Sequence, residues 1–339
     1  MTKQLLSASM GAIVIVGTLV LAPASPSAGQ APAVARAPAA ARASTPAPRT
    51  PWGDPDLQGT WSSEAALGVP IERPAQFGDR QFLTDAEFAQ REAQTARQLQ
   101  SDNADFDLDT ADRSNAGQVG SATSPPPHWL ERGKASRRSS SVIDPPSGRI
   151  PPMTPEAQKR GQGARGTFAG SAFNSSQDLS LWERCISRGL PGAIFPTVYN
   201  ANTRISQGPG FVAITYEMIH DTRIIPTDGR PHVASAIRSY FGDSRGRWEG
   251  DTLVVDVTNV SEKNNYRGSR DTLHLVERFT RDGETLRYEA TFDDPATWTK
   301  PWTAALDLAF QPEGMFEYAC HEGNHSMRNI LSGARAAEK

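Results

Sequence analysis

Residues 272–292 read TLHLVERFTRDGETLRYEATF, and this stretch decides the fold class. Apolar and polar residues alternate on both sides of the central Asp282-Gly283, a pattern typical of two antiparallel strands joined by a tight turn. Because successive side chains of a strand point to opposite faces, one face of this hairpin is apolar and the other is polar. The stretch therefore predicts a β-hairpin in a sheet that has one buried face.

The register of this hairpin is predicted from its turn. A two-residue turn at Asp282-Gly283 pairs residues on the apolar face as follows: Phe279 with Leu286, Glu277 with Tyr288, Leu275 with Ala290, and Leu273 with Phe292. A slip by one residue brings Arg287 opposite Glu277 but scrambles the apolar face, so hydrophobic matching favours the first register. That register also sets Arg278 opposite Arg287, a small repulsion on the polar face. Glu277 is predicted to lie on the buried face.

The same alternation recurs along the C-terminal half of the chain. The predicted strands are 211–220, 234–241, 252–260, 272–280, 285–292 and 302–310. Short turns rich in Gly, Pro and Asp separate them, which favours antiparallel neighbours. We therefore predict a mainly β fold, an antiparallel meander that closes into a barrel or half-barrel, with a short N-terminal helix and long irregular insertions.

The N-terminus has the composition of a secretory signal. Residues 1–24 combine Lys3, an apolar core at 10–21 and the small-residue site Ala22-Pro23-Ala24. Residues 25–50 are rich in Ala and Pro and are predicted to be a disordered linker. The protein is thus predicted to be periplasmic or secreted, with no stable membrane span after signal removal. Retention of the signal as an anchor stays open as an alternative.

Residues 51–339 are predicted to form a single β-rich domain. Thr84 and Glu87 have the spacing of a capping box and open a helix that runs to about Gln100. From 101 to 166 the pattern breaks down into Asp, Ser, Pro and Arg, which indicates an irregular insertion.

The net charge limits the classes of partner that the protein can bind, and the two cysteines bear on the compartment in which it folds. The formal net charge of −3 does not match the basic surface of a nucleic-acid-binding protein, so a small molecule or saccharide is the expected ligand. No phosphate loop or dinucleotide motif occurs, and no cofactor is predicted. Cys185 and Cys320 are the only cysteines, and in an oxidising compartment they are predicted to form a disulfide. Two separate buried thiols are the alternative.

Several longer motifs resemble a known family. They are PWGDPDLQGTW at 51–61, IDPPSGRIPP at 143–152, HDTRIIP at 220–226, GDSRGRWEGDTL at 242–253 and YACHEGN at 318–324. In these motifs the chain resembles a large family of exported bacterial proteins of uncharacterised function, common in acidobacteria and in some proteobacteria. The resemblance implies export and a β-rich fold similar to lipocalin-like barrels, and it implies no activity.

Glu277 is the first candidate for chemistry. A carboxyl group among apolar side chains is either a structural acid with a cationic partner or an acid/base group with a shifted pKa. His220 is predicted at the end of strand 211–220, on its apolar side, where Asp221 can orient the imidazole for proton transfer. Arg223 is predicted either to hold a substrate carboxylate or phosphate or to neutralise Glu277.

Three aromatic residues are candidates for substrate binding. Tyr288 and Tyr216 lie on the apolar sides of their predicted strands. Trp248 lies in the polar stretch 242–248, predicted to be a loop, and can stack on a sugar ring or a flat organic ligand. Packing in the core or at the rim is the alternative role for each of them.

The stretch His321-Glu322-Gly323-Asn324-His325 matches the zinc-protease pattern H-E-x-x-H. That site needs a helix and a third ligand, but Gly and Asn disfavour a helix interior and only a frayed tail is predicted to follow. The preceding residues 315–320 alternate like a strand. We therefore predict no metal here, with a zinc-dependent hydrolase as a minor alternative.

Two classes of function follow from these residues. The first is an exported enzyme that uses acid/base chemistry on a small organic or carbohydrate-derived substrate in a barrel pocket, as a lyase, isomerase or hydrolase. Its catalytic groups would be Glu277, His220 and Asp221. The second is a non-catalytic periplasmic or secreted protein that binds a small ligand in the same pocket.

Overall fold

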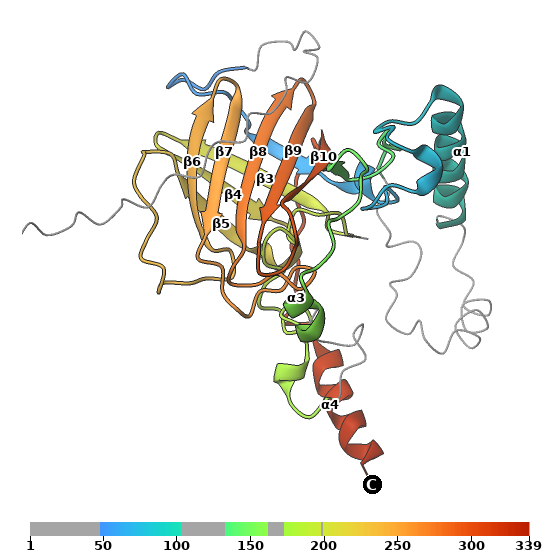
Figure 1. Cartoon of the computed structure of the whole chain (residues 1–339), viewed down its shortest axis with the longest axis vertical. Coiled ribbons are helices and arrows are strands. Elements are labelled where there is room, and N and C mark those ends of the chain that lie inside the picture. The colour runs from blue at the N-terminus through green and yellow to red at the C-terminus, as the bar shows by residue number, and fades with distance from the viewer. Residues whose placement is uncertain (1–47, 103–132, 162–172, 198, 339) are drawn as a thin grey trace, which may run out of the picture. The chain divides into compact units, whose positions relative to one another are not determined.

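The structure is a computed structural model that describes residues 48–102, 133–161, 173–197 and 199–338 (Figure 1). The described residues all belong to one compact unit. The predicted signal peptide at 1–24 and nearly all of the predicted linker at 25–50 lie outside the described residues. Among the described helices, none is both long enough and apolar enough to cross a membrane.

Ten antiparallel strands form one sheet that curves into a nearly closed barrel, which confirms the predicted fold class. The strands are β1 (Gly59–Ser62), β2 (Val142–Asp144), β3 (Asn202–Gly208), β4 (Phe211–Tyr216), β5 (Thr222–Pro226), β6 (Asp243–Glu249), β7 (Thr252–Thr258), β8 (His274–Asp282), β9 (Thr285–Asp293) and β10 (Trp302–Phe310). Their order is β5-β4-β3-β1-β10-β9-β8-β7-β6, and β2 pairs with β10.

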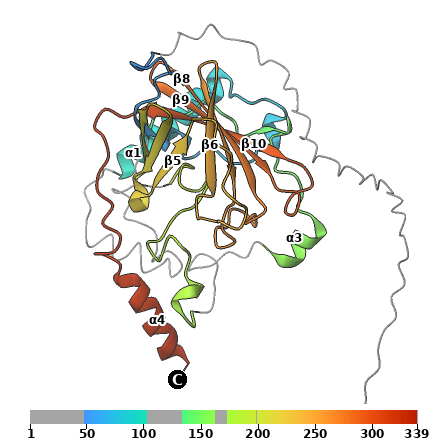
Figure 2. The same ribbon diagram turned by 90° about the vertical axis from the view of Figure 1, so that its left-hand side faces the viewer.

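The barrel closes between β5 and β6, which can be followed in Figure 2. These two strands are the ends of the hydrogen-bonded order, so no ladder joins them. Instead, side chains of Ile225 and Thr227 approach the backbone at Gly246, where an added Cβ would lie 2.9 and 2.8 Å from their Cγ2 atoms. We call this boundary the β5–β6 seam. Glycine at 246 is what allows the two strands to come this close.

Most of the predicted strands are present, and two predictions are wrong. The stretch 234–241 contains no strand; it belongs to the connection between β5 and β6, and its Ile237 is 62% exposed. The polar stretch 242–248, predicted to be a loop, is instead β6 with flanking Gly242. The alternation of apolar and polar residues could not show that 242–248 forms a strand and 234–241 does not, because β6 places only small residues and Trp248 on its inner face.

The hairpin of β8 and β9 has the predicted faces but a different register. The two turn residues are Gly283 and Glu284, so each pairing is displaced by two residues, and Phe279 rather than Glu277 faces Tyr288. Gly283 has φ 60° at the first turn position, the position where a tight hairpin turn favours glycine. A displacement of two keeps every side chain on its predicted face. It also sets Arg278 opposite Glu289, which removes the predicted repulsion.

The barrel interior is a continuous apolar core. Phe292 and Trp302 stack with ring centroids 3.9 Å apart, and Trp298 meets Trp302 edge to face at 5.4 Å. Aliphatic side chains of β7 and the inner faces of β8, β9 and β10 complete it. The few polar side chains inside this core therefore stand out.

The helices lie outside the barrel wall. They are α1 (Asp85–Asp102), α3 (Pro155–Arg160) and α4 (His325–Ala337), with 3-10 turns η1 (Glu64–Ala66), η2 (Ala75–Phe77), η5 (Ser176–Asp178) and η6 (Met218–His220). The predicted capping box is confirmed, because the Thr84 amide donates to Glu87 at 2.8 Å and the Glu87 amide donates to Thr84 at 3.3 Å. The predicted insertion at 101–166 contains β2 and α3 in its described part.

Candidate functional site

A buried polar centre lies inside the barrel around Glu277. The Arg223 guanidinium from β5 donates to both carboxylate oxygens of Glu277 from β8, at 2.5 and 3.2 Å. The Tyr288 hydroxyl from β9 donates to the same carboxylate at 2.9 Å. Glu277 and Tyr288 are fully buried, and Arg223 is 4% exposed. The alternation of apolar and polar residues around Glu277 predicts this buried position.

In this centre Arg223 is held in its charged form and Tyr288 in its protonated form. Burial alone would lower the pKa of Arg223, but the neighbouring Glu277 carboxylate raises it above its ordinary value. Burial, reinforced by Glu277, raises the pKa of Tyr288 well above its ordinary value. Arg223 therefore stays charged and Tyr288 stays protonated, so both donate to Glu277. A bidentate arginine and a phenol thus donate three hydrogen bonds to the two oxygens of the Glu277 carboxylate.

Tyr216 completes the centre from β4. Its ring stacks on Phe241 with centroids 5.5 Å apart and planes 2° apart. Burial raises the pKa of Tyr216, so its hydroxyl is also protonated. By distance and angle, neither the Tyr216 hydroxyl nor the Arg223 Nε makes a hydrogen bond within the described chain, although Arg223 lies near enough to Tyr216 to oppose the rise of its pKa. Two polar atoms of one buried centre are thus left unsatisfied.

Two more unsatisfied polar atoms lie across the β5–β6 seam. Ser244 and Trp248 of β6 pair with the buried residues Val257 and Leu253 of β7 and face the barrel interior with them. Ser244 Oγ and Trp248 Nε1 are buried and have no hydrogen-bond partner among the described residues. The predicted binding residue Trp248 therefore belongs to the inner wall rather than to a loop.

His220 does not join this centre, which corrects its predicted orientation. Strand β4 ends at Tyr216, and the chain turns through Ile219 and His220, both with positive φ of 68° and 48°. Because the strand ends early, its alternation no longer applies, and His220 is exposed whereas Ile219 is buried. Asp221 is half-buried, and burial raises its pKa. Arg223, Glu277, Tyr288 and Tyr216 are brought together; the catalytic role of the predicted groups stays a prediction.

A second polar cluster, which the sequence analysis missed, lies on the outer face of β6, β7 and β8. His232 Nδ1 lies 2.6 Å from Asp243, His232 Nε2 lies 2.8 Å from Asp256, and His274 Nε2 lies 2.8 Å from the other oxygen of Asp256. Arg245 pairs with Asp243 at 2.8 Å. We call these five residues the His–Asp chain.

The His–Asp chain fastens the β5–β6 connection to the sheet. His232 is the only member from that connection, and its ring can donate to both Asp243 and Asp256 when both nitrogens carry protons. The hydrogen bond to Asp256 raises the pKa of His274. Burial alone would raise the pKa of Asp256, but hydrogen bonds from His274 and His232 hold it below its ordinary value. The outward alternation of Asp256 and His274 is the sequence signal that could have located this cluster.

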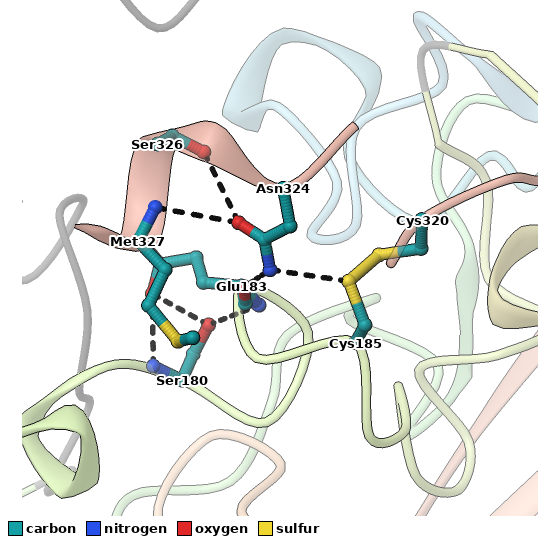
Figure 3. Close-up of a disulfide and its surroundings, with 7 residues drawn as sticks. All are labelled: Ser180, Glu183, Cys185, Cys320, Asn324, Ser326 and Met327. Carbon is teal, nitrogen blue, oxygen red and sulfur yellow. Dashed lines mark hydrogen bonds between the residues drawn. A yellow bond between two sulfur atoms is a disulfide. The ribbon is translucent and has the colours of Figure 1, made fainter. Parts of the chain in front are cut away.

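The H-E-x-x-H stretch is not helical across its length (Figure 3). Helix α4 begins at His325, and Asn324 is its N-cap, accepting from the Met327 amide at 3.3 Å. His321 and Glu322 lie in the preceding turn, so the two imidazoles do not share a helix face. The predicted strand at 315–320 is absent, and the predicted frayed tail is wrong because α4 occupies it. In the described residues no three His, Cys, Asp or Glu side chains converge as a metal site.

The predicted disulfide between Cys185 and Cys320 is confirmed, and it spans 135 residues. Asn324 supports it, because its amide donates to the Glu183 carbonyl at 2.9 Å and to Cys185 Sγ at 3.3 Å. Asn324 thus joins the start of α4 to the turn that carries Cys185.

Comparison of the chain with protein-family models, with curated proteins and with solved structures finds no match. The site must be interpreted from its own geometry.

Proposed function

We propose that this chain is an exported protein that binds a small neutral polar molecule, such as a saccharide, at the β5–β6 seam. The observation that carries the proposal is a group of four buried atoms on β4, β5 and β6 that make no hydrogen bond among the described residues: Tyr216 Oη, Arg223 Nε, Ser244 Oγ and Trp248 Nε1. Burying a polar group without a partner costs about 1–3 kcal/mol. A bound molecule or water that meets these atoms offsets that cost.

The chemistry of the four atoms favours a hydroxyl-rich ligand. Arg223 Nε and Trp248 Nε1 can only donate, whereas the Tyr216 and Ser244 hydroxyls can donate and accept. The charge of Arg223 is already neutralised by Glu277, so the seam offers no net charge to an ion. The Trp248 ring adds a flat apolar surface of the kind that packs against sugars.

The β5–β6 seam can also serve as the route by which a ligand enters the barrel. Elsewhere in the barrel wall, separating two neighbouring strands breaks a hydrogen-bond ladder, but β5 and β6 meet through side chains alone. Opening the wall there costs fewer hydrogen bonds than at any other strand pair of the order.

Binding is favoured over catalysis by the state of Glu277, whose two oxygens are occupied by Arg223 and Tyr288. The enzyme alternative is decided by Glu277→Gln. A catalytic Glu277 predicts lost turnover with a nearly unchanged melting temperature. A structural Glu277 predicts a large loss of stability, because Arg223 is left buried without its counter-charge.

Titration calorimetry with a panel of neutral mono- and disaccharides tests the binding site. We expect a sugar to bind the native chain, and Trp248→Phe to weaken that binding roughly tenfold, because one hydrogen bond to the ligand is lost. Trp52→Phe is the matched control, since Trp52 lies exposed near the N-terminal end of the described chain. Absence of binding across the panel, or equal loss in both variants, would contradict the proposal.

A further inference from the structure

Arg188 is a half-buried arginine for which no carboxylate partner is found in the described part of the chain. Its one hydrogen bond runs from Nη1 to the Met218 sulfur at 2.9 Å. A thioether is a weak acceptor and carries no charge. Among the described residues, therefore, no acidic group compensates the charge of this guanidinium.

Aromatic side chains lie near this guanidinium, whose central carbon is 5.5 Å from the Trp182 ring centroid. Tyr199 and Tyr318 stack with centroids 6.4 Å apart and planes 17° apart, and both are near enough to interact with the Arg188 charge. Burial, together with Tyr318, raises the pKa of Tyr199 to about 12, so its hydroxyl remains a donor at neutral pH. Burial lowers the pKa of Arg188, which reflects the missing counter-charge.

Covalent and packing constraints hold these residues in place. Arg188 follows Cys185 by three residues and Tyr318 precedes Cys320 by two, so the disulfide ties the two segments together. Next to Arg188, Gly189 has φ 62° and an added Cβ would lie 1.8 Å from the Asn264 side chain. This close approach leaves the Arg188 segment little room to move.

We propose that Arg188, Tyr199 and Tyr318 form a binding site for a small organic anion, whose carboxylate pairs with the guanidinium while its apolar body packs against Trp182. Arginine presents a planar set of donors that matches a carboxylate. The half-buried guanidinium can exchange water for a charged ligand, because no carboxylate of the described chain pairs with it. The site is separate from the β5–β6 seam, which takes a neutral ligand, and it does not depend on the proposed function.

Titration calorimetry of the purified chain with benzoate tests the site, with benzyl alcohol as the neutral analogue. We expect benzoate to bind and benzyl alcohol not to bind. Arg188→Met should lower benzoate affinity at least about tenfold, because a charge-assisted hydrogen bond is lost. The matched control is Arg184→Met, since Arg184 lies in the same segment and its side chain donates to the exposed Gln177 side chain at 3.1 Å. It should leave benzoate affinity unchanged.

Stability measurements separate a ligand site from a structural role. Without ligand, Arg188→Met should leave the melting temperature unchanged or raise it, because an uncompensated charge is removed. A clear fall would mark Arg188 as structural and overturn the site. Equal affinity for benzoate and benzyl alcohol, no benzoate binding, or equal loss in both arginine variants would also overturn it.

Removing the disulfide gives a second, independent test of the anion site. Cys185→Ser combined with Cys320→Ser should weaken benzoate binding, since Tyr318 is no longer held beside Arg188, while saccharide binding at the seam should persist. Unchanged benzoate affinity in this variant would contradict the three-residue site. Loss of saccharide binding alone would contradict only the proposed function.

Discussion

Two arginines, the buried Arg223 inside the barrel and the half-buried Arg188 in the segment of the disulfide, differ in how their charge is compensated. Arg223 meets Glu277 with two hydrogen bonds and is closed off from solvent. Among the described residues, Arg188 meets a thioether and aromatic rings but no carboxylate. A charge that the fold compensates belongs to the architecture, whereas a charge that the fold leaves uncompensated is available to a ligand.

The two regions also differ in how they are held. The barrel centre is fixed by strand ladders on both sides of β4, β8 and β9. The Arg188 region has little regular structure, and the disulfide with the Asn324 hydrogen bonds connects it to α4. The following experiments test this contrast, beginning with the largest expected effect.

Arg223→Met should lower the free energy of unfolding by about 3–5 kcal/mol, because it leaves Glu277 buried and unpaired. Urea denaturation measures the change. The double variant Arg223→Met with Glu277→Leu should recover most of the loss, since no charge then remains in the core. A loss below that of an ordinary surface substitution would break the contrast with Arg188.

Removing the disulfide should lower the free energy of unfolding by about 2–4 kcal/mol, because the unfolded chain is no longer constrained across 135 residues. Guanidinium denaturation of Cys185→Ser with Cys320→Ser checks this expectation. An unchanged midpoint would mean that packing around Asn324, rather than the crosslink, holds the Arg188 region.

Gly246→Ala should lower the free energy of unfolding by about 1–3 kcal/mol, because its Cβ would overlap Ile225 and Thr227 at the seam. The control is Gly333→Ala in α4, where nothing lies within 4 Å of the added Cβ. Thermal unfolding of both variants shows whether the seam is as tightly closed as the contacts around Gly246 indicate. Equal midpoints would count against a close approach of β5 and β6.

The His–Asp chain predicts a small pH effect. The raised pKa of His274 means that its charge stabilises the fold below pH about 6.5, the ordinary histidine value, and this contribution is lost as pH rises through the raised pKa. The lowered pKa of Asp256 adds stability above pH about 4, lost as pH falls through the lowered pKa.

His274→Asn should therefore cost about 0.5 kcal/mol at pH 5.5 and less at pH 8.5, the partial exposure of His274 limiting the effect. Urea denaturation at the two pH values measures this difference. His232 and Asp293 also face His274 or its partner, so a cost that is equal at both pH values would assign the stabilisation to groups other than His274.

Periodicity and local chemistry were sufficient for part of the molecule. The alternation of 272–292 placed Glu277 on the buried face, the Thr84 and Glu87 spacing placed the start of α1, and the isolated pair Cys185 and Cys320 allowed one disulfide. These features depend on residues a few positions apart or, for the disulfide, on having one possible partner. These features can be predicted without knowing which strands lie next to one another.

The remaining features depend on contacts between distant segments. Arg223 and Glu277 are 54 residues apart, and only the closure of β5 near β8 joins them. The turn at Gly283 moved the hairpin register by two, and the early end of β4 turned His220 outward. The His–Asp chain needs a loop and three strands at once. The alternation of side chains is a property of a single strand. The register between strands, the closure of the barrel at the β5–β6 seam and the partner of each buried side chain are set by the packing of many strands. For that reason only the tertiary structure decided them.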